Sequence, residues 1–270
     1  MSADDPAFAL LSANRTAAAR SRARRARSLV TLTAMPMPVV LLHGFAGTAR
    51  HWDRVIAELP EGRFAPLALN LADADPLTPD GVARLVSSAT AAEPAILVGY
   101  SMGGRLALQA ALAMPDRILR LVLVSASAGI EDRSVRDARR VADDALAGEI
   151  EGNSIDAFIS RWRGQGLFVH DPDHVAEEIA ADERRCTPAG LAAMLRGLGP
   201  GAIAPMWDRL GELTMGVAIL AGELDSAYVK HGRRIAAGVA RATFRCVPGV
   251  GHRVALQAPR EVARALCDTT

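Results

Sequence analysis

Cysteine, net charge and long apolar runs are all scarce in this sequence of 270 residues. The three cysteines, Cys186, Cys246 and Cys267, are widely separated and lack metal-ligand spacing, so we expect a reducing, cytoplasmic setting and no disulfide framework. A formal net charge of +1 argues against a nucleic-acid or membrane-surface role for the whole chain. The longest apolar runs, such as VVLLHGF, are too short to span a bilayer, so no stable membrane insertion is expected.

Hydrophobic residues, by contrast, make up 50% of the chain. This composition is typical of a globular protein, and the length suffices for one α/β domain with a full core and an inserted subdomain. No internal repeat or low-complexity segment follows residue 36.

Residues 1–36 differ from the rest of the chain in being rich in arginine and alanine. No apolar stretch follows the arginines, so a secretory signal is not expected. The segment is predicted to be a disordered or loosely helical basic tail, and a mitochondrial-type transit peptide is the alternative. Its arginines are Arg15, Arg20, Arg22, Arg24, Arg25 and Arg27.

From residue 37 onward, short apolar runs alternate with stretches of helical spacing, which indicates βαβ units and a buried, mostly parallel sheet. Strands are predicted within 38–44, 64–71, 95–100, 118–127, 216–225 and 243–252. Helices are predicted within 51–59, 79–90, 102–114, 229–240 and 260–267. Thr78 is expected to cap the second of these helices.

Residues 131–208 interrupt this alternation, because they contain several amphipathic helical stretches and no convincing strand. We therefore predict a single α/β core of residues 37–130 and 209–270, interrupted by a helical lid insertion at 131–208. Such an insertion would lie over the carboxyl ends of the strands, where open α/β sheets bind their ligands.

Gly99-Tyr100-Ser101-Met102-Gly103 follows a predicted strand and opens a predicted helix. This context is typical of a nucleophile elbow, in which flanking glycines allow a sharp turn and the serine Oγ is presented at a helix N-terminus. The alternative is an ordinary strand–helix turn in which Ser101 caps the helix.

A serine needs a histidine partner, and the histidine needs an acid that sets its tautomer. Asp225 and His252 both follow predicted strands, in the chain order that α/β hydrolases use. Taken singly, each could be a turn or loop residue; the order Ser101, Asp225, His252 makes a chance arrangement improbable.

The loop after the first strand supplies a second expected feature. The backbone amides of Phe45 and Met102 are predicted to form an oxyanion hole, and His43 is expected to brace this loop. The other histidines, His51, His170, His174 and His231, are expected to be solvated.

Arginines suggest the charge of the ligand. Arg105 lies four residues beyond Ser101 on the same helical face, although a solvent-facing arginine is the alternative. In the lid, Arg136, Arg139 and Arg140 share one helical face, and pairing with nearby aspartates is the alternative there. Together these arginines favour a pocket for a polyanionic, polycarboxylate substrate.

The sequence resembles a known family, the 2-succinyl-6-hydroxy-2,4-cyclohexadiene-1-carboxylate (SHCHC) synthases of menaquinone biosynthesis, over nearly all of residues 38–270. The arginine after the elbow, the helix RDARR and the lid tryptophan in SRW are its more specific features. The resemblance is carried by the stretches LLHGFAGTARHW, LVGYSMGGRLAL, RDARRVADDALA, FISRWRGQGLF, LAAMLRGLG, ILAGELDSAYV and GVGHRV.

The resemblance implies an α/β-hydrolase fold and a lyase that eliminates pyruvate from 2-succinyl-5-enolpyruvyl-6-hydroxy-3-cyclohexene-1-carboxylate. Ser101 would be the base, His252 its activator and Asp225 the orienting acid, and the amides of Phe45 and Met102 would stabilise the developing enolate. No metal or organic cofactor, no nucleic-acid partner and no particular oligomeric state is implied.

The resemblance also implies a set of substrate-binding residues. A third arginine of the family falls on either Arg184 or Arg185, and His43 is counted with the binding site. The full predicted set is Arg105, Arg139, Tyr100, Trp162, Arg184, Arg185 and His43.

The chain departs from the family pattern at several positions. The stretch LNLADADPL has Asn70 where relatives carry an aspartate, and it lacks their Gly-His-Gly. Ala255 and Gln257 replace a histidine and a glutamate, and Gly166 replaces a proline. These changes bear on substrate identity more than on catalysis, so a carboxylesterase or lactonase with Ser101 as nucleophile is the alternative function. A third hypothesis, a binding protein without catalytic activity, is disfavoured because Ser101, Asp225 and His252 form a complete triad.

Overall fold

The computed structural model describes residues 35–90 and 93–268. The chain divides into two units, Met1–Pro36 and Met37–Thr270, and every element named below belongs to the second. The arginines of the predicted basic tail lie outside the described residues.

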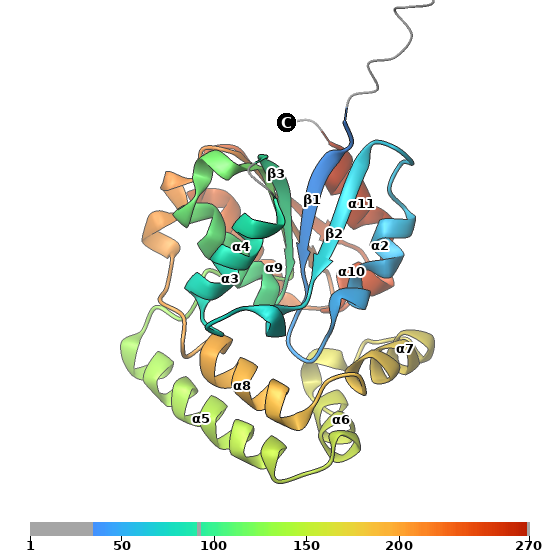
Figure 1. Cartoon of the computed structure of the whole chain (residues 1–270), viewed down its shortest axis with the longest axis vertical. Helices are drawn as coiled ribbons and strands as arrows, with labels where there is room; N and C mark the ends of the chain where they lie inside the picture. The colour runs from blue at the N-terminus through green and yellow to red at the C-terminus, as the bar shows by residue number, and fades with distance from the viewer. Residues whose placement is uncertain (1–34, 91–92, 269–270) are drawn as a thin grey trace, which may run out of the picture. The chain divides into compact units, whose positions relative to one another are not determined.

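Six parallel strands form one sheet in the order β2-β1-β3-β4-β5-β6 (Figure 1). The strands are β1 (Met37–Leu42), β2 (Phe64–Leu69), β3 (Ala95–Tyr100), β4 (Ile118–Val124), β5 (Gly216–Gly222) and β6 (Ala242–Val247). β3, β4 and β5 are almost entirely apolar, as expected of strands covered on both faces. The predicted parallel sheet is confirmed.

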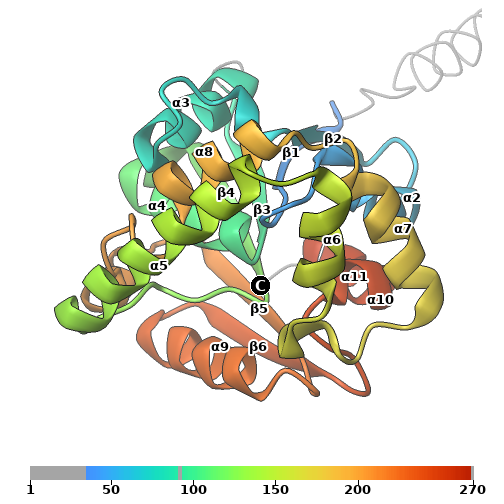
Figure 2. The same ribbon diagram turned by 90° about the horizontal axis from the view of Figure 1, so that it is seen from below.

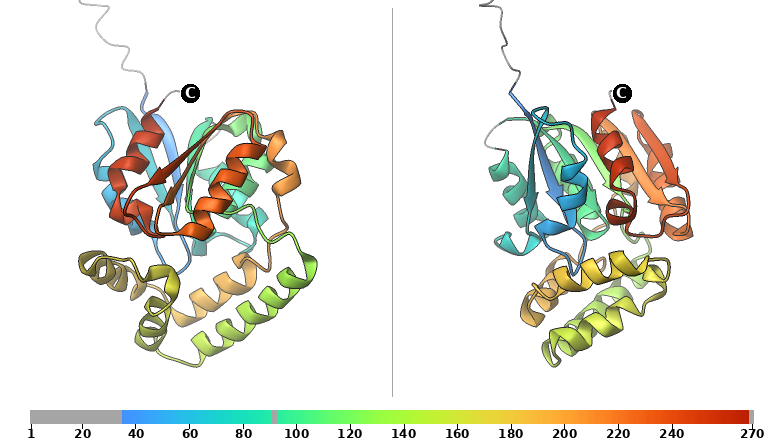
Figure 3. Two further views of the ribbon diagram at one scale, coloured as in Figure 1. Left: turned by 180° about the vertical axis from the view of Figure 1, so that it is seen from behind. Right: turned by 90° about the vertical axis from the view of Figure 1, so that its right-hand side faces the viewer.

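Helices cover both faces of the sheet, because successive side chains of a strand point to opposite sides. Leu97 belongs to a core cluster that includes residues of α3 (Pro79–Ala89), α4 (Met102–Ala113) and α9 (Ser226–Gly238). The next residue, Val98, belongs to a second cluster. That cluster includes residues of α2 (Asp53–Ala57), α10 (Val254–Gln257) and α11 (Pro259–Cys267), and Figure 3 shows the two layers of helices.

Local signals set several of the helix boundaries. The prediction that Thr78 caps a helix is confirmed, because its Oγ1 accepts a hydrogen bond from the Gly81 amide at 3.2 Å. α4 ends at Ala113, two residues before Pro115. The stretch 51–59, predicted as one helix, is a short 3-10 turn, Ala49–Trp52, followed by the five residues of α2. The other short 3-10 turns are Leu71–Asp73, Pro115–Arg117, Gly166–Phe168 and Trp207–Glu212.

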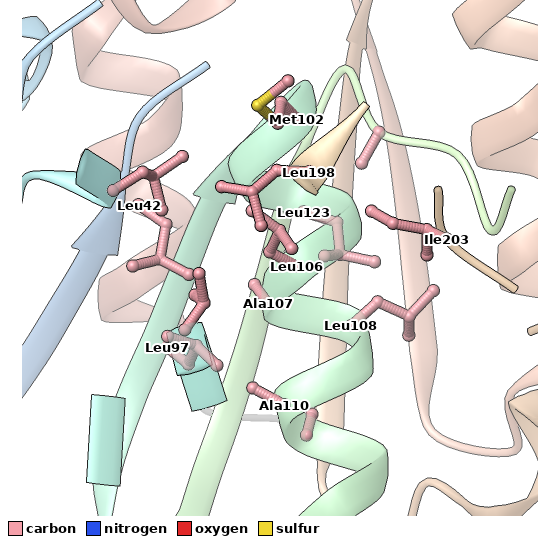
Figure 4. Packing of buried hydrophobic residues seen from close by; sticks show 14 of the residues in the cluster. Leu42, Leu97, Met102, Leu106, Ala107, Leu108, Ala110, Leu123, Leu198 and Ile203 are labelled. Carbon is pink, nitrogen blue, oxygen red and sulfur yellow. The ribbon is translucent and has the colours of Figure 1, made fainter. Parts of the chain in front are cut away.

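Four helices lie beyond the carboxyl ends of the strands (Figures 1 and 2). Leu198 and Ile203 join them to the core, since both belong to the same buried cluster as Met102 and Leu106 (Figure 4). The helices are α5 (Arg133–Glu151), α6 (Ile155–Arg163), α7 (Asp173–Glu183) and α8 (Pro188–Leu198), and we call them the lid helices. Among the described helices, none has both the length and the apolar character needed to cross a membrane.

Candidate active site

Ser101 stands between β3 and α4 in a backbone conformation, φ 52° and ψ −110°, that few residues other than glycine adopt. Its amide donates a hydrogen bond to the Val124 carbonyl of the neighbouring strand at 2.9 Å. A Cβ atom on Gly103 would overlap the carbonyl oxygens of Leu42 and His43. The tight approach of α4 to the end of β1 therefore requires glycine there, and it fixes the serine at the start of the helix.

Ser101, His252 and Asp225 form one hydrogen-bonded chain. His252 Nε2 lies 3.0 Å from Ser101 Oγ, and His252 Nδ1 lies 2.6 Å from Asp225 Oδ2. The three side chains come from the loops after β3, β6 and β5, respectively. Ser125 Oγ donates a hydrogen bond to the His252 carbonyl at 2.8 Å and so fixes the histidine loop. The structure thus brings together the three residues that the sequence predicted as a catalytic set.

The imidazole of His252 is suited to accept a proton. It is 1% exposed, and burial lowers its pKa, while the hydrogen bond that it donates to Asp225 raises the pKa. A carboxylate can only accept a hydrogen bond, so Nδ1 carries the proton and Nε2 is free to take the proton of the serine hydroxyl.

Two backbone amides, those of Phe45 and Met102, have no hydrogen-bond acceptor among the described residues. Met102 is the first residue of α4, so its amide has no acceptor within the helix. The amide of Phe45 donates to none of the described residues. Both residues line the cavity described below, where an oxyanion would need such donors.

His43 supports the loop that carries Phe45. Its Nδ1 donates to the Gly44 carbonyl at 2.7 Å, and its Nε2 accepts from the Leu71 amide at 3.0 Å, so both nitrogens are occupied by backbone. His43 does not line the cavity. It braces the loop, and the structure does not place it among the groups that could touch a substrate.

A cavity of about 180 Å³ opens at Ser101 between the carboxyl ends of the strands and the lid helices. The predicted residues that line it are Ser101, His252, Phe45, Met102, Tyr100, Arg105, Arg139 and Trp162. The Trp162 ring, from α6, packs edge-on against Phe45 with ring centroids 4.9 Å apart, which couples the lid to the loop after β1.

Arg105 lines this cavity from α4 and is buried. It is 4% exposed, and its guanidinium donates to no carboxylate or carbonyl of the described residues. Burial lowers its pKa, but an arginine side chain stays charged in proteins. The alternative of a solvent-facing arginine is therefore wrong, and an unpaired cation lies one helical turn from Ser101.

Of the three lid arginines predicted to share a cationic face, only Arg139 reaches the cavity. Its Nε donates to Asp143 Oδ1 at 2.7 Å, so it is partly neutralised. Arg136 Nη1 donates a hydrogen bond to the Ile130 carbonyl at 2.8 Å. Arg140 lines a separate surface pocket.

The structure places neither Arg184 nor Arg185 in the cavity. Arg184 is 56% exposed and bound to Asp156, and Arg185 lines a different pocket. The further arginine of the cavity is Arg253, which sequence reasoning did not single out. The sequence did carry a signal for Arg253, because this residue directly follows His252 and therefore lies in the same loop.

Three more aromatic residues of the cavity, His51, Phe168 and Tyr228, were missed. His51 was expected to be solvated, and this is wrong: it is buried and stacks on the Tyr100 ring at a centroid distance of 4.6 Å. Its burial follows from the packing of the 3-10 turn Ala49–Trp52 against the core. Tyr228, three residues after Asp225, lies with its ring 4.5 Å from that of His252.

The departures from the family pattern have structural roles of their own. Asn70 Oδ1 accepts from the Ala49 amide at 2.9 Å. Gln257 accepts from the Gly251 amide at 2.9 Å and donates to Asp171 Oδ1 at 2.8 Å, so it links the histidine loop to the lid. Within residues 35–90 and 93–268, no three His, Cys, Asp or Glu side chains form a group able to hold a metal ion.

Comparisons with known proteins identify the family of this chain. The family model "Alpha/beta hydrolase family" matches residues 39–265. A putative SHCHC synthase of Bacillus subtilis is 30% identical over 82% of this chain and 86% of its own length. The SHCHC synthase of Escherichia fergusonii is 26% identical over 84% and 91%.

A solved structure, MenH from S. aureus, superposes with a TM-score of 0.79 at 25% identity, covering 88% of this chain and 94% of that one. The parallel sheet, the order of Ser101, Asp225 and His252, and these matches lead to one conclusion: the chain is an enzyme with the α/β-hydrolase fold and belongs to the alpha/beta hydrolase family, within which it resembles the SHCHC synthases.

Proposed function

We propose that this enzyme eliminates pyruvate from 2-succinyl-5-enolpyruvyl-6-hydroxy-3-cyclohexene-1-carboxylate and yields SHCHC, a step of menaquinone biosynthesis in the cytoplasm. The single observation that carries the proposal is Arg105. A buried guanidinium without a carboxylate partner among the described residues, in the same cavity as Ser101, calls for an anionic substrate. The names of the relatives supply the substrate's identity.

In the proposed mechanism, His252 accepts the hydroxyl proton of Ser101 while Ser101 Oγ removes a ring proton of the substrate. The electron pair of the broken C–H bond at C2 forms a double bond between C2 and C3, the double bond between C3 and C4 shifts to C4 and C5, and the C5–O bond to the enolpyruvyl group breaks. The leaving group takes up a proton and becomes pyruvate, and the ring becomes a conjugated diene. No acyl-enzyme forms, so Ser101 acts as a base and not as a nucleophile.

The other residues have supporting roles in this proposal. Asp225 holds the His252 tautomer. The amides of Phe45 and Met102 stabilise the oxygen that becomes enolate-like when the proton leaves. Arg105 and Arg139 bind substrate carboxylates, and Tyr100 and Trp162 hold the ring. Residues 131–208 act as a lid over the core of residues 37–130 and 209–270.

The test is to supply the enolpyruvyl substrate and to follow both pyruvate release and the ultraviolet absorbance of the diene. The two signals are expected to rise together with one pyruvate for each diene, and Ser101→Ala is the control. Rapid turnover of p-nitrophenyl esters with no pyruvate from the enolpyruvyl substrate would instead assign a carboxylesterase or lactonase.

A further inference from the structure

A second polar group of residues borders the cavity on the lid side, apart from Ser101 and Arg105. Arg253 Nη1 binds Asp171 Oδ2 at 2.6 Å, and its guanidinium carbon lies 3.9 Å from the centre of the Phe168 ring. Its Nη2 reaches Glu183 Oε1 only at 3.5 Å. Arg253 is therefore held mainly by Asp171, and Glu183 is the weakly bound member of the group.

Glu183 has an unsatisfied oxygen at this place. The residue ends α7, lines the cavity and is 2% exposed. Its Oε2 is buried and makes no hydrogen bond with any of the described residues. A buried carboxylate oxygen without a partner is costly, and it indicates that a proton or a ligand group completes the site.

Charged groups surround Glu183 from several elements. Arg253 from the histidine loop and Arg163 from α6 favour its carboxylate form, whereas Asp171 and Asp182 disfavour it. Asp182 accepts hydrogen bonds from the Thr48 amide and hydroxyl. The Cys186 thiol lies close to both Asp182 and Glu183. The largest effect is burial, which raises the pKa of Glu183 to about 7.

We propose that Glu183 takes up one proton from the solvent when an anionic substrate enters the cavity, and that its carboxyl group then donates a hydrogen bond from Oε2 to a substrate carboxylate. Two carboxylates in one poorly solvated site cannot both stay ionised at low cost, so a shared proton is the favoured arrangement. The anionic charge of the substrate rests on the proposed function. Glu183 is then a substrate-binding residue that makes binding depend on pH.

The experiment measures binding of 2-succinylbenzoate, a stable dicarboxylate that carries a succinyl group and a ring carboxylate like those of SHCHC. Calorimetry at pH 7.5 in two buffers of different protonation enthalpy counts the protons bound. Wild type is expected to take up about 0.8 proton, and Glu183→Gln, which imitates the protonated form, close to none. Glu177→Gln, an exposed glutamate of the same helix, is the matched control and is expected to behave like wild type.

Affinity gives a second readout that a merely structural role would not produce. At pH 8, Glu183→Gln is expected to bind the probe about tenfold more tightly than wild type, and at pH 6 the two are expected to be equal. Equal proton uptake in wild type and Glu183→Gln would assign the proton to another group, such as His252, and overturn the proposal. Weaker binding by Glu183→Gln at every pH, or no binding of the probe by wild type at millimolar concentration, would also overturn it. Failure of the proposed function is seen separately, as absence of pyruvate in the turnover assay.

Discussion

His252 Nε2 lies 3.0 Å from Ser101 Oγ, across 151 residues of sequence that include all four lid helices. The contact depends on two loops that leave the carboxyl ends of β3 and β6, two strands of one parallel sheet with β4 and β5 between them. The geometry allows the imidazole to take the serine proton without movement of the backbone.

The acid side of the pH–rate profile follows from the burial of His252. The base must be neutral, and burial lowers its pKa below the ordinary value of about 6.5. Activity should therefore be present at and above pH 6.5 and be lost as the pH falls through a lower midpoint. The measurement is the pH dependence of kcat/KM in Glu183→Gln, because Glu183 cannot titrate in this variant. We expect kcat/KM to fall only on the acid side, with one midpoint. A midpoint at or above pH 7 would contradict the assignment of His252 as a buried neutral base.

Two replacements of Ser101, by alanine and by glycine, distinguish the chemical role of its hydroxyl from the strain of its backbone. Ser101→Ala and Ser101→Gly are both expected to lose pyruvate release by about a thousandfold or more, because both lack the hydroxyl. Glycine tolerates the φ of 52° that alanine does not, so Ser101→Gly should be the more stable of the two by about 1 kcal/mol. Thermal unfolding should show this as a melting temperature higher by about 2–4 °C. Equal melting temperatures would mean that this turn stores no strain.

Gly103 and Gly148 form a matched pair for the close approach of α4 to β1. Gly103→Ala should destabilise the protein by about 1–3 kcal/mol, since the added methyl group meets rigid carbonyl oxygens. Gly148→Ala, in α5, meets nothing within 4 Å and should stabilise the protein by about 0.5–1 kcal/mol through helix propensity. Denaturant unfolding of the two variants measures both effects. Equal stability of Gly103→Ala and wild type would show that α4 can move away from β1.

The core of the site could be predicted from the sequence because its signals are local. The glycines around Ser101, the apolar runs before Asp225 and His252, and the Thr78 cap each depend on a few neighbouring residues. Helical spacing and the resemblance to SHCHC synthases both located Arg105, although only the structure showed that its guanidinium is buried and has no carboxylate or carbonyl partner among the described residues.

The lid side of the cavity could not be predicted, because burial there depends on how distant segments pack. Arg136, Arg139 and Arg140 have equivalent helical spacing, yet only Arg139 reaches the cavity. Arg253 and Glu183 lie 70 residues apart, and neither belongs to a local pattern. Their contact arises from the packing of α7 against the histidine loop, and helical periodicity carries no information about it.

The most direct test of the account is the effect of Arg105→Ala on two substrates, with Arg184→Ala as the matched arginine outside the cavity. We predict that Arg105→Ala lowers kcat/KM for pyruvate release from the enolpyruvyl substrate by about a hundredfold or more, the loss expected when a buried charge-assisted contact to a carboxylate is removed. Any hydrolysis of p-nitrophenyl acetate should change less than about threefold, and Arg184→Ala should leave both rates near those of wild type. A hundredfold loss on the enolpyruvyl substrate alone is the result that the account predicts; an equal loss on both substrates, or no loss on either, would contradict it.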